Sequence, residues 1–144
     1  MPRILLTGAT GYIGSHTWLA LQEAGFAVVG VDNFANSSPR VLERLAELAG
    51  RQPVFERVDV CDEAALHGVF ERHAIDAVVH FAALKAVGES VQRPLDYFRN
   101  NLGGLLAVCE AMRASTSGEL LEKSSTPITS QPASCSASQV CEPM

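Results

Sequence analysis

The sequence has no run of basic residues, and its acidic side chains outnumber its basic ones. Among 144 residues there are 11 Lys and Arg against 16 Asp and Glu, which gives a formal net charge of −5. Binding to a nucleic acid depends on a cluster of Lys and Arg that neutralises phosphates. The composition therefore excludes nucleic acid as an expected partner.

Long apolar runs are also missing. A membrane-spanning helix needs roughly twenty consecutive apolar residues, and no segment approaches that length. The start, Met1-Pro2-Arg3, leads directly into a strand-like run, without the charged and apolar regions of a secretory leader. We expect a cytoplasmic protein without a membrane partner. Its length and its 47% apolar residues predict one domain with a core.

Cysteine is scarce and shows no metal-type pattern. The four cysteines are Cys61, Cys109, Cys135 and Cys141, and none of them forms a closely spaced ligand motif. Free thiols in a reducing compartment are the expected state. His67 and His73 have no partner ligands nearby in the sequence, so solvated or helix-capping roles are expected for them. We predict no metal site.

Three glycines spaced three apart follow the first apolar run. Gly8, Gly11 and Gly14 stand between apolar residues 4–6 and a helix-like segment, 12–24. This order predicts a buried strand, a tight turn and a helix. Glycines at these places let the backbone turn, let a pyrophosphate approach the main chain and let the helix pack on the strand. The helix amino terminus then faces an anion, so the pattern predicts a nucleotide site.

An acidic residue ends the second apolar run. Asp32 follows residues 27–31, about twenty residues beyond the glycines, where a carboxylate accepts both hydroxyls of an adenosine ribose. Because that carboxylate would repel a 2′-phosphate, NAD is favoured over NADP. The alternative, a carboxylate that only closes a strand-to-loop turn, stays open.

Strand and helix patterns alternate four times. Further strands are predicted at 54–60 and 77–81. The apolar faces expected of the four helices are Ile13, Thr17, Ala20, Leu21 and Ala24; Val41, Leu42, Leu45 and Leu48, closed by Gly50; Leu66, Val69, Phe70 and His73, after an N-cap at Asp62; and Tyr97, Asn101, Leu105, Val108 and Met112, after Pro94. Alternation predicts an α/β, Rossmann-type doubly wound parallel sheet in the order 3-2-1-4, truncated after about four strands, with its switch point between strands 1 and 4.

The regular pattern ends near Arg113. Residues 114–144 contain eight Ser, three Thr and three Pro without a sustained period. This composition predicts an irregular or disordered tail, apart from one possible helical turn at 118–123. We therefore divide the chain into a nucleotide-binding part, 1–113, and a tail, 114–144.

One longer stretch adds a family resemblance. It runs from His80 to Val91 and reads His-Phe-Ala-Ala-Leu-Lys-Ala-Val-Gly-Glu-Ser-Val. Together with the glycine turn, Asp32-Asn33 and the segment 94–101, it resembles the UDP-glucose 4-epimerase family of extended short-chain dehydrogenases/reductases, over residues 3 to about 113. The resemblance implies NAD as cofactor, a UDP-hexose as substrate and a homodimer.

The resemblance also implies a role for each matching residue. The pyrophosphate turn would be Gly8, Gly11, Tyr12, Ile13 and Gly14, and the adenosine ribose would lie against Asp32, Asn33, Phe34, Ala35, Asn36 and Ser37. Asp59 and Val60 would flank the adenine. The nicotinamide half would lie over Phe81, Ala82, Ala83, Leu84 and Lys85, with Lys85 reaching its ribose or phosphate, and Asn100 would complete the pocket.

The family's catalytic base is missing from the sequence. Members interconvert UDP-glucose and UDP-galactose by moving a hydride between C4 of the sugar and NAD through a 4-keto intermediate, with a Tyr-x-x-x-Lys pair and a Ser or Thr hydroxyl. Here the only tyrosines are Tyr12 and Tyr97 and the only lysines Lys85 and Lys123. The Ser-rich run 134–138 weakly resembles the family's strand that carries the Ser or Thr hydroxyl, which makes Ser136 the one candidate catalytic residue.

Three interpretations follow from that departure. The first is an inactive amino-terminal piece of an epimerase, without a substrate domain and of marginal stability, because its fourth strand would be an open sheet edge and its helices would expose apolar faces. The second is a non-catalytic NAD-binding or interaction module. The third is a non-functional truncated product.

Overall fold

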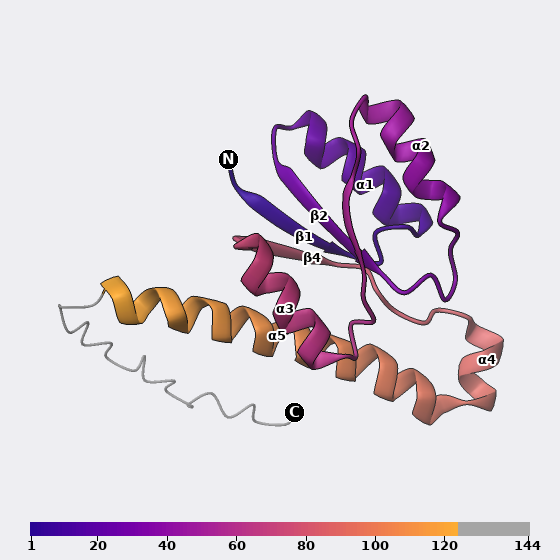
Figure 1. Cartoon of the computed structure of the whole chain (residues 1–144). Helices are drawn as coiled ribbons and strands as arrows, with labels where there is room; N and C mark the ends of the chain where they lie inside the picture. Colours follow the sequence, from indigo (N-terminus) through magenta and orange to yellow (C-terminus); the bar gives the residue numbers. More distant parts are fainter. Residues whose placement is uncertain (124–144) are drawn as a thin grey trace, which may run out of the picture.

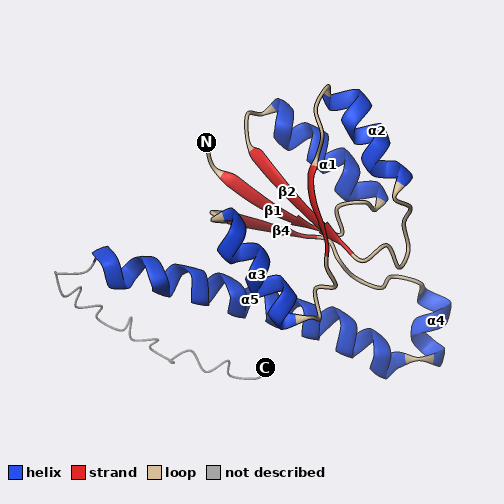
Figure 2. Cartoon of the chain, viewed as in Figure 1, coloured by secondary structure: helices blue, strands red, loops and turns tan. Residues whose placement is uncertain are grey.

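The four predicted strands form one parallel sheet in the predicted order. The computed structural model describes residues 1–123, with side chains through Ser115. The strands are β1 (Arg3–Thr7), β2 (Ala27–Asp32), β3 (Val54–Arg57) and β4 (Ala77–His80), arranged β3-β2-β1-β4 (Figure 2). β3 is shorter than the predicted 54–60. The α/β doubly wound fold is therefore confirmed, with β4 at one edge of the described sheet.

Helices cover both faces of the sheet. α1 (Tyr12–Glu23) and α2 (Arg40–Ala49) lie on one face, and α3 (Glu63–His73) and α5 (Pro94–Lys123) on the other (Figure 1). The short α4 (Val87–Gln92), which the sequence patterns did not predict, lies beside the start of α5. The predicted helix ends at Asp62 and Gly50 are confirmed. The Asp62 carboxylate accepts a hydrogen bond from Ala65 N at 3.0 Å, and Gly50 ends α2 with a left-handed φ of 65°.

Each face of the sheet carries its own core. Alternate strand residues point to opposite faces, so the neighbours Leu5 and Leu6 belong to different clusters. The α1 and α2 side gathers Leu6, Ala9, Trp18, Val28 and Leu45. The α3 and α5 side gathers Leu5, Val29, Val31, Val58, Val60, Leu66, Val69, Phe70, Ala107, Val108 and Ala111. The predicted α3 face at 66, 69 and 70 is confirmed.

The predicted apolar face of α1 is partly wrong: Leu21 packs against the core, but three other predicted members do not. Ile13 is 50% exposed and Ala20 and Ala24 are exposed, whereas Gly14 and Trp18 are buried. The reason is one large side chain: the Trp18 ring fills the space above Gly30 of β2, where an added methyl carbon would lie 1.9 Å from it. On α2, Leu48 is likewise exposed rather than buried.

The face predicted for α5 is partly wrong. Tyr97 and Val108 are buried, but Leu105 and Met112 are exposed, and the small residues Gly104, Ala107 and Ala111 are buried in their place. Small side chains occupy these positions because they let α5 pack closely against the rest of the chain. A methyl carbon added at Gly104 would lie 2.8 Å from the Val60 side chain.

α5 also extends beyond its predicted end. It continues from Arg113 to Lys123, so residues 114–117 are helical rather than irregular, and the helical turn considered at 118–123 is the end of α5. Each helical residue added to an existing helix gains one backbone hydrogen bond, so a few Ser, Thr and Gly do not end it. The rest of the tail, 124–144, with Ser136, Cys135 and Cys141, lies outside the described residues.

Two negative findings concern the described part of the chain. None of the helices within residues 1–123 is both long enough and apolar enough to cross a bilayer. Within the same residues, no three His, Cys, Asp or Glu side chains gather in a way that could hold a metal ion. His73 instead contacts the Glu56 carboxylate, which also binds Arg72.

Candidate functional site

A cavity opens at the carboxyl ends of the parallel strands. This is the edge where doubly wound folds bind ligands, beside the switch point between β1 and β4. Its wall comprises Gly8, Gly11, Tyr12, Ile13, Gly14, Asp32, Asn33, Ala35, Asn36, Ser37, Val58, Asp59, Val60, Phe81, Ala82, Ala83, Leu84, Lys85 and Asn100. The structure therefore brings every predicted cofactor residue except Phe34 to one cavity, and it adds Val58.

The glycine turn permits two close backbone approaches. Gly8 has a φ of 64°, and a methyl carbon added there would lie 2.8 Å from Ala82 N in the chain after β4. A methyl carbon at Gly14 would lie 2.1 Å from the Gly8 carbonyl oxygen. α1 then begins with Gly11 as its N-cap and without a side-chain cap. Because the first N–H groups of a helix have no intrahelical partner, this edge of the cavity suits an anion.

Asp32 is held at the end of β2 by its neighbours. Its Oδ2 accepts a hydrogen bond from Thr10 N at 3.1 Å, and its Oδ1 accepts one from Phe34 N at 2.9 Å. Buried Thr10 also places its hydroxyl 2.7 Å from that of Ser37. A carboxylate offers about four lone-pair sites. Asp32 therefore keeps acceptor capacity for a ligand hydroxyl.

The turn after β2 is tied to the turn after β3. Asn33 Nδ2 donates to Asp59 Oδ2 at 2.9 Å, so the two predicted residues position each other. Phe34 does not line the cavity. Its backbone is left-handed, with a φ of 62°, and the centroid of its ring lies 5.2 Å from that of Phe55. Its backbone N–H still supports Asp32, but the structure places its side chain in packing rather than in the wall.

The segment 81–85 is fastened at both ends. The Thr7 hydroxyl accepts hydrogen bonds from Phe81 N at 3.1 Å and Ala82 N at 3.2 Å. At the other end, the Asn101 amide accepts from Leu84 N at 2.8 Å and donates to Leu84 O at 3.0 Å. This wall of the cavity is therefore set by β1 on one side and by α5 on the other.

One imidazole joins the first of these fastenings. His80 Nδ1 lies 2.7 Å from the Thr7 hydroxyl oxygen. The ring is half-buried, and that burial lowers the pKa of His80 below its ordinary value. A neutral ring is therefore favoured at this place near neutral pH.

Sequence patterns missed three residues that shape the site. Thr7 ends β1 and Thr10 stands inside the glycine turn, but a hydroxyl at either place gives no signal of its partner, which lies 22 to 75 residues away. Asn101 was visible on the helix from Pro94, but only as a packing position. The one signal in the sequence was that Asn101, a hydrogen-bonding residue, stood on a face predicted to be apolar.

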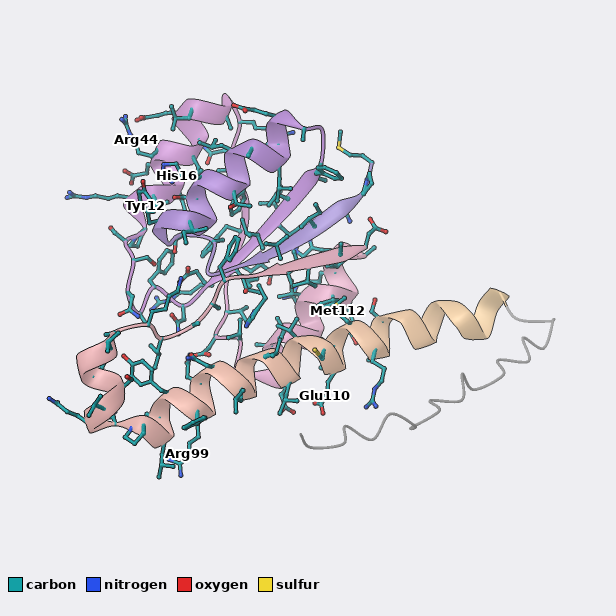
Figure 3. All side chains as sticks on the ribbon, turned by 180° about the vertical axis from the view of Figure 1, so that it is seen from behind. Tyr12, His16, Arg44, Arg99, Glu110 and Met112 are labelled. Atoms are coloured by element: carbon teal, nitrogen blue, oxygen red, sulfur yellow. The ribbon has the colours of Figure 1, made fainter. Side chains whose placement is uncertain are left out.

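No tyrosine of the described part is placed to act as a base in the cavity. Tyr12 belongs to the cavity wall, but the residue is 81% exposed and its ring lies against that of His16, with the centroids 4.6 Å apart (Figure 3). The Tyr97 hydroxyl donates to Glu89 at 2.8 Å, between α4 and α5. The site thus has the parts of a nucleotide cradle, and its described residues do not supply a Tyr–Lys pair.

Comparison with known proteins supports this geometry. A family model described as the NAD dependent epimerase/dehydratase family matches residues 4–142, well past Arg113, where the motif resemblance stopped. UDP-glucose 4-epimerase of Mus musculus is 49% identical over 138 residues, covering 92% of this chain and 40% of the relative. The enzyme of Haemophilus influenzae is 41% identical over 139 residues, covering 96% and 41%.

Solved structures agree with these relatives. A UDP-glucose 4-epimerase from Stenotrophomonas maltophila, with bound NAD and formylated UDP-arabinopyranose, superposes with a TM-score of 0.78 at 45% identity over 81% of this chain and 34% of that one. One from Bifidobacterium longum, in complex with NAD⁺ and UDP, gives 0.77 at 43% over 79% and 34%. This chain spans about 40% of the length of its curated relatives. Over residues 4–142, the chain belongs to the NAD dependent epimerase/dehydratase family, and it is a homologue of the UDP-glucose 4-epimerases.

Proposed function

We propose that this chain is the amino-terminal, NAD-binding part of a UDP-glucose 4-epimerase. The observation that carries the proposal is the single cavity at the switch point, in which the glycine turn, Asp32 and the segment 81–85 meet. The NAD complexes of homologous epimerases support it. The backbone of the glycine turn would hold the pyrophosphate, and Asp32 the adenosine ribose. Exposed Lys85 would reach the nicotinamide ribose or a phosphate.

In the complete enzyme this site would serve the interconversion of UDP-glucose and UDP-galactose. NAD bound in the cavity would supply the hydride acceptor and donor for C4 of the hexose. The chain's own part is to bind and orient the cofactor. The tyrosine base and its lysine do not occur in these 144 residues at the required spacing. We therefore propose that the chain alone binds NAD and does not turn over the sugar.

Calorimetric titration with NAD tests the binding half of the proposal. Saturable heat with one site is expected, and NADP should bind more weakly because its 2′-phosphate would meet the Asp32 carboxylate. Asp32→Asn removes the charge and keeps an acceptor oxygen, so NAD affinity should fall roughly tenfold, as for a charge-assisted hydrogen bond. Asp96→Asn, in the first turn of α5 and outside the cavity wall, is the matched control. A folded chain that gives no heat up to millimolar NAD would refute the site.

A coupled assay with UDP-galactose tests the catalytic half. We expect no conversion by the 144-residue chain, even at saturating NAD. Measurable turnover would show that a base other than a Tyr-x-x-x-Lys pair operates here, and would overturn that half while leaving the binding result intact.

A separate observation supports the homodimer that the resemblance implied. Large apolar side chains remain uncovered along α5 at spacings of three and four: Leu95, Phe98, Leu102, Leu105 and Leu106 are 44–64% exposed. A patch of this kind marks an interaction surface, and we propose that a second copy covers it. Sedimentation equilibrium should show a dimer, which Leu102→Glu converts to monomer and Arg44→Glu, on α2, does not. A monomeric unmodified chain at high concentration would contradict this.

A further inference from the structure

The Thr7 hydroxyl makes three polar contacts although it has only one hydrogen. Thr7 is fully buried at the end of β1. Its oxygen lies 3.1 Å from Phe81 N, 3.2 Å from Ala82 N and 2.7 Å from His80 Nδ1. The Phe81 N–H is shared with the Thr7 carbonyl oxygen at 3.2 Å.

Counting donors and acceptors decides the direction of the third contact. A backbone N–H can only donate, so Phe81 and Ala82 occupy the two lone pairs of the Thr7 hydroxyl. The remaining hydroxyl hydrogen then has His80 Nδ1 as its partner, and that nitrogen must be an unprotonated acceptor. A hydrogen on Nδ1 would instead bring a third donor to the same oxygen and leave the buried hydroxyl hydrogen without an acceptor, which is costly. The ring hydrogen therefore belongs on Nε2.

The contact lies where it controls the cavity wall. Phe81 and Ala82 begin the segment 81–85. Ala82 N also faces Gly8 so closely that no side chain fits between them. An oriented Thr7 hydroxyl thus sets the separation between the glycine turn and this segment.

We propose that His80, as the neutral tautomer with hydrogen on Nε2, is a positioning residue for the cofactor cavity and acts through the Thr7 hydroxyl. This rests on the proposed function, in that the cavity holds NAD. The lowered pKa that burial gives His80 agrees with an acceptor nitrogen at Nδ1.

The tautomer is tested first, on the full unmodified chain and without cofactor. Nitrogen NMR of ¹⁵N-histidine-labelled protein at neutral pH should show His80 with a pyridine-type Nδ1 and a protonated Nε2. Thr7→Val removes the hydroxyl, and the ring should then shift to an averaged tautomer pattern. Hydrogen on Nδ1, a charged ring or an averaged pattern in the unmodified chain would overturn the proposal.

Two variants then test positioning. His80→Asn places an acceptor oxygen where Nδ1 stands, whereas His80→Leu has a similar size and no acceptor. Amide exchange at Phe81 and Ala82 should accelerate about tenfold in His80→Leu, as for one lost hydrogen bond, and be restored in His80→Asn. NAD affinity should follow the same order. His67→Leu, on α3 and outside the cavity wall, is the matched control.

Equal amide exchange at Phe81 and Ala82 in both His80 variants and the unmodified chain would overturn the proposal. Absence of NAD binding in the unmodified chain would instead refute the proposed function, since the tautomer and exchange results do not depend on it.

Discussion

The two helical layers of the sheet differ in how completely this chain covers them. On the α1 and α2 side, the largest side chain, Trp18, is fully buried above Gly30. On the α3 and α5 side, the long α5 buries mainly small residues and leaves Phe98 and Leu106 more than 60% exposed. Arg99 and Glu110 mark the side of α5 turned away from the sheet (Figure 3). We call the first layer closed because its largest side chain is buried, although Ile13 and Leu48 stay exposed, and the second layer open because α5 offers a row of apolar side chains to a partner.

The candidate site depends mostly on the closed layer. The glycine turn leads into α1, and the residues around Asp32 follow β2 and precede α2. Among the described side chains of α5, Asn100 alone contributes to the wall, and Asn101 forms hydrogen bonds with Leu84. We therefore expect changes in the closed layer to cost stability and binding together, and changes on the outer side of α5 to cost neither.

The largest expected effect comes from removing Trp18. Trp18→Ala should lower the free energy of unfolding by about 3–5 kcal/mol, the usual loss for a large aromatic in a core. Phe98→Ala removes an aromatic from the open layer and should change it by less than about 0.5 kcal/mol. Urea unfolding followed by circular dichroism measures both, at a protein concentration low enough to keep the chain monomeric. Similar losses in the two variants would abolish the contrast between the layers.

The next effect comes from overfilling the same contact. In Gly30→Ala the new methyl group would collide with the Trp18 ring, because the space holds only one of them. Overpacking of this kind costs about 1–3 kcal/mol. Combining Gly30→Ala with Trp18→Ala should cost less than the sum of the two, since the ring that collides is gone. Additive losses in the double variant, from the same urea curves, would mean that the two residues do not compete for one space.

The contrast also explains what the sequence could predict. Strand order, the glycine turn and the residues after β2 and β4 follow from local patterns, since each strand end is marked by the residues next to it. The buried faces of α1 and α5 could not be read from apolar spacing, because Trp18 sets the buried face of α1 and the small residues Gly104 and Ala111 are buried on α5. The contacts of Thr7 join residues more than seventy positions apart, so no local pattern encodes them.

A moderate effect is expected at the start of α3, in the second layer. Asp62 caps this helix through Ala65 N, and Asp62→Ala should lower the free energy of unfolding by about 1 kcal/mol. Asp62→Asn keeps a capping oxygen and serves as the matched variant. Comparing the thermal unfolding of Asp62→Ala and Asp62→Asn separates the loss of the capping oxygen from the loss of the negative charge. An equal shift in both would assign the loss to the carboxylate charge rather than to the cap.

The smallest effect concerns the ion pairs that join α3 to β3. The hydrogen bond from Arg72, assisted by His73, holds the pKa of Glu56 below its ordinary value. A carboxyl group with a lowered folded pKa binds fewer protons in the folded chain than in the unfolded chain. Its contribution to the free energy of unfolding is therefore present above the ordinary pKa of glutamate, about 4.3, and is lost as the pH falls through the folded pKa.

Because the pair is partly exposed, Glu56→Gln should cost less than about 1 kcal/mol at neutral pH. Urea unfolding between pH 7 and pH 3 should show the curves of the unmodified chain and Glu56→Gln converging at the acid end. Glu110→Gln, which removes one carboxylate on the outer side of α5, is the matched control. A Glu56→Gln curve that stays parallel to that of the unmodified chain would show that these ion pairs do not link α3 to the sheet.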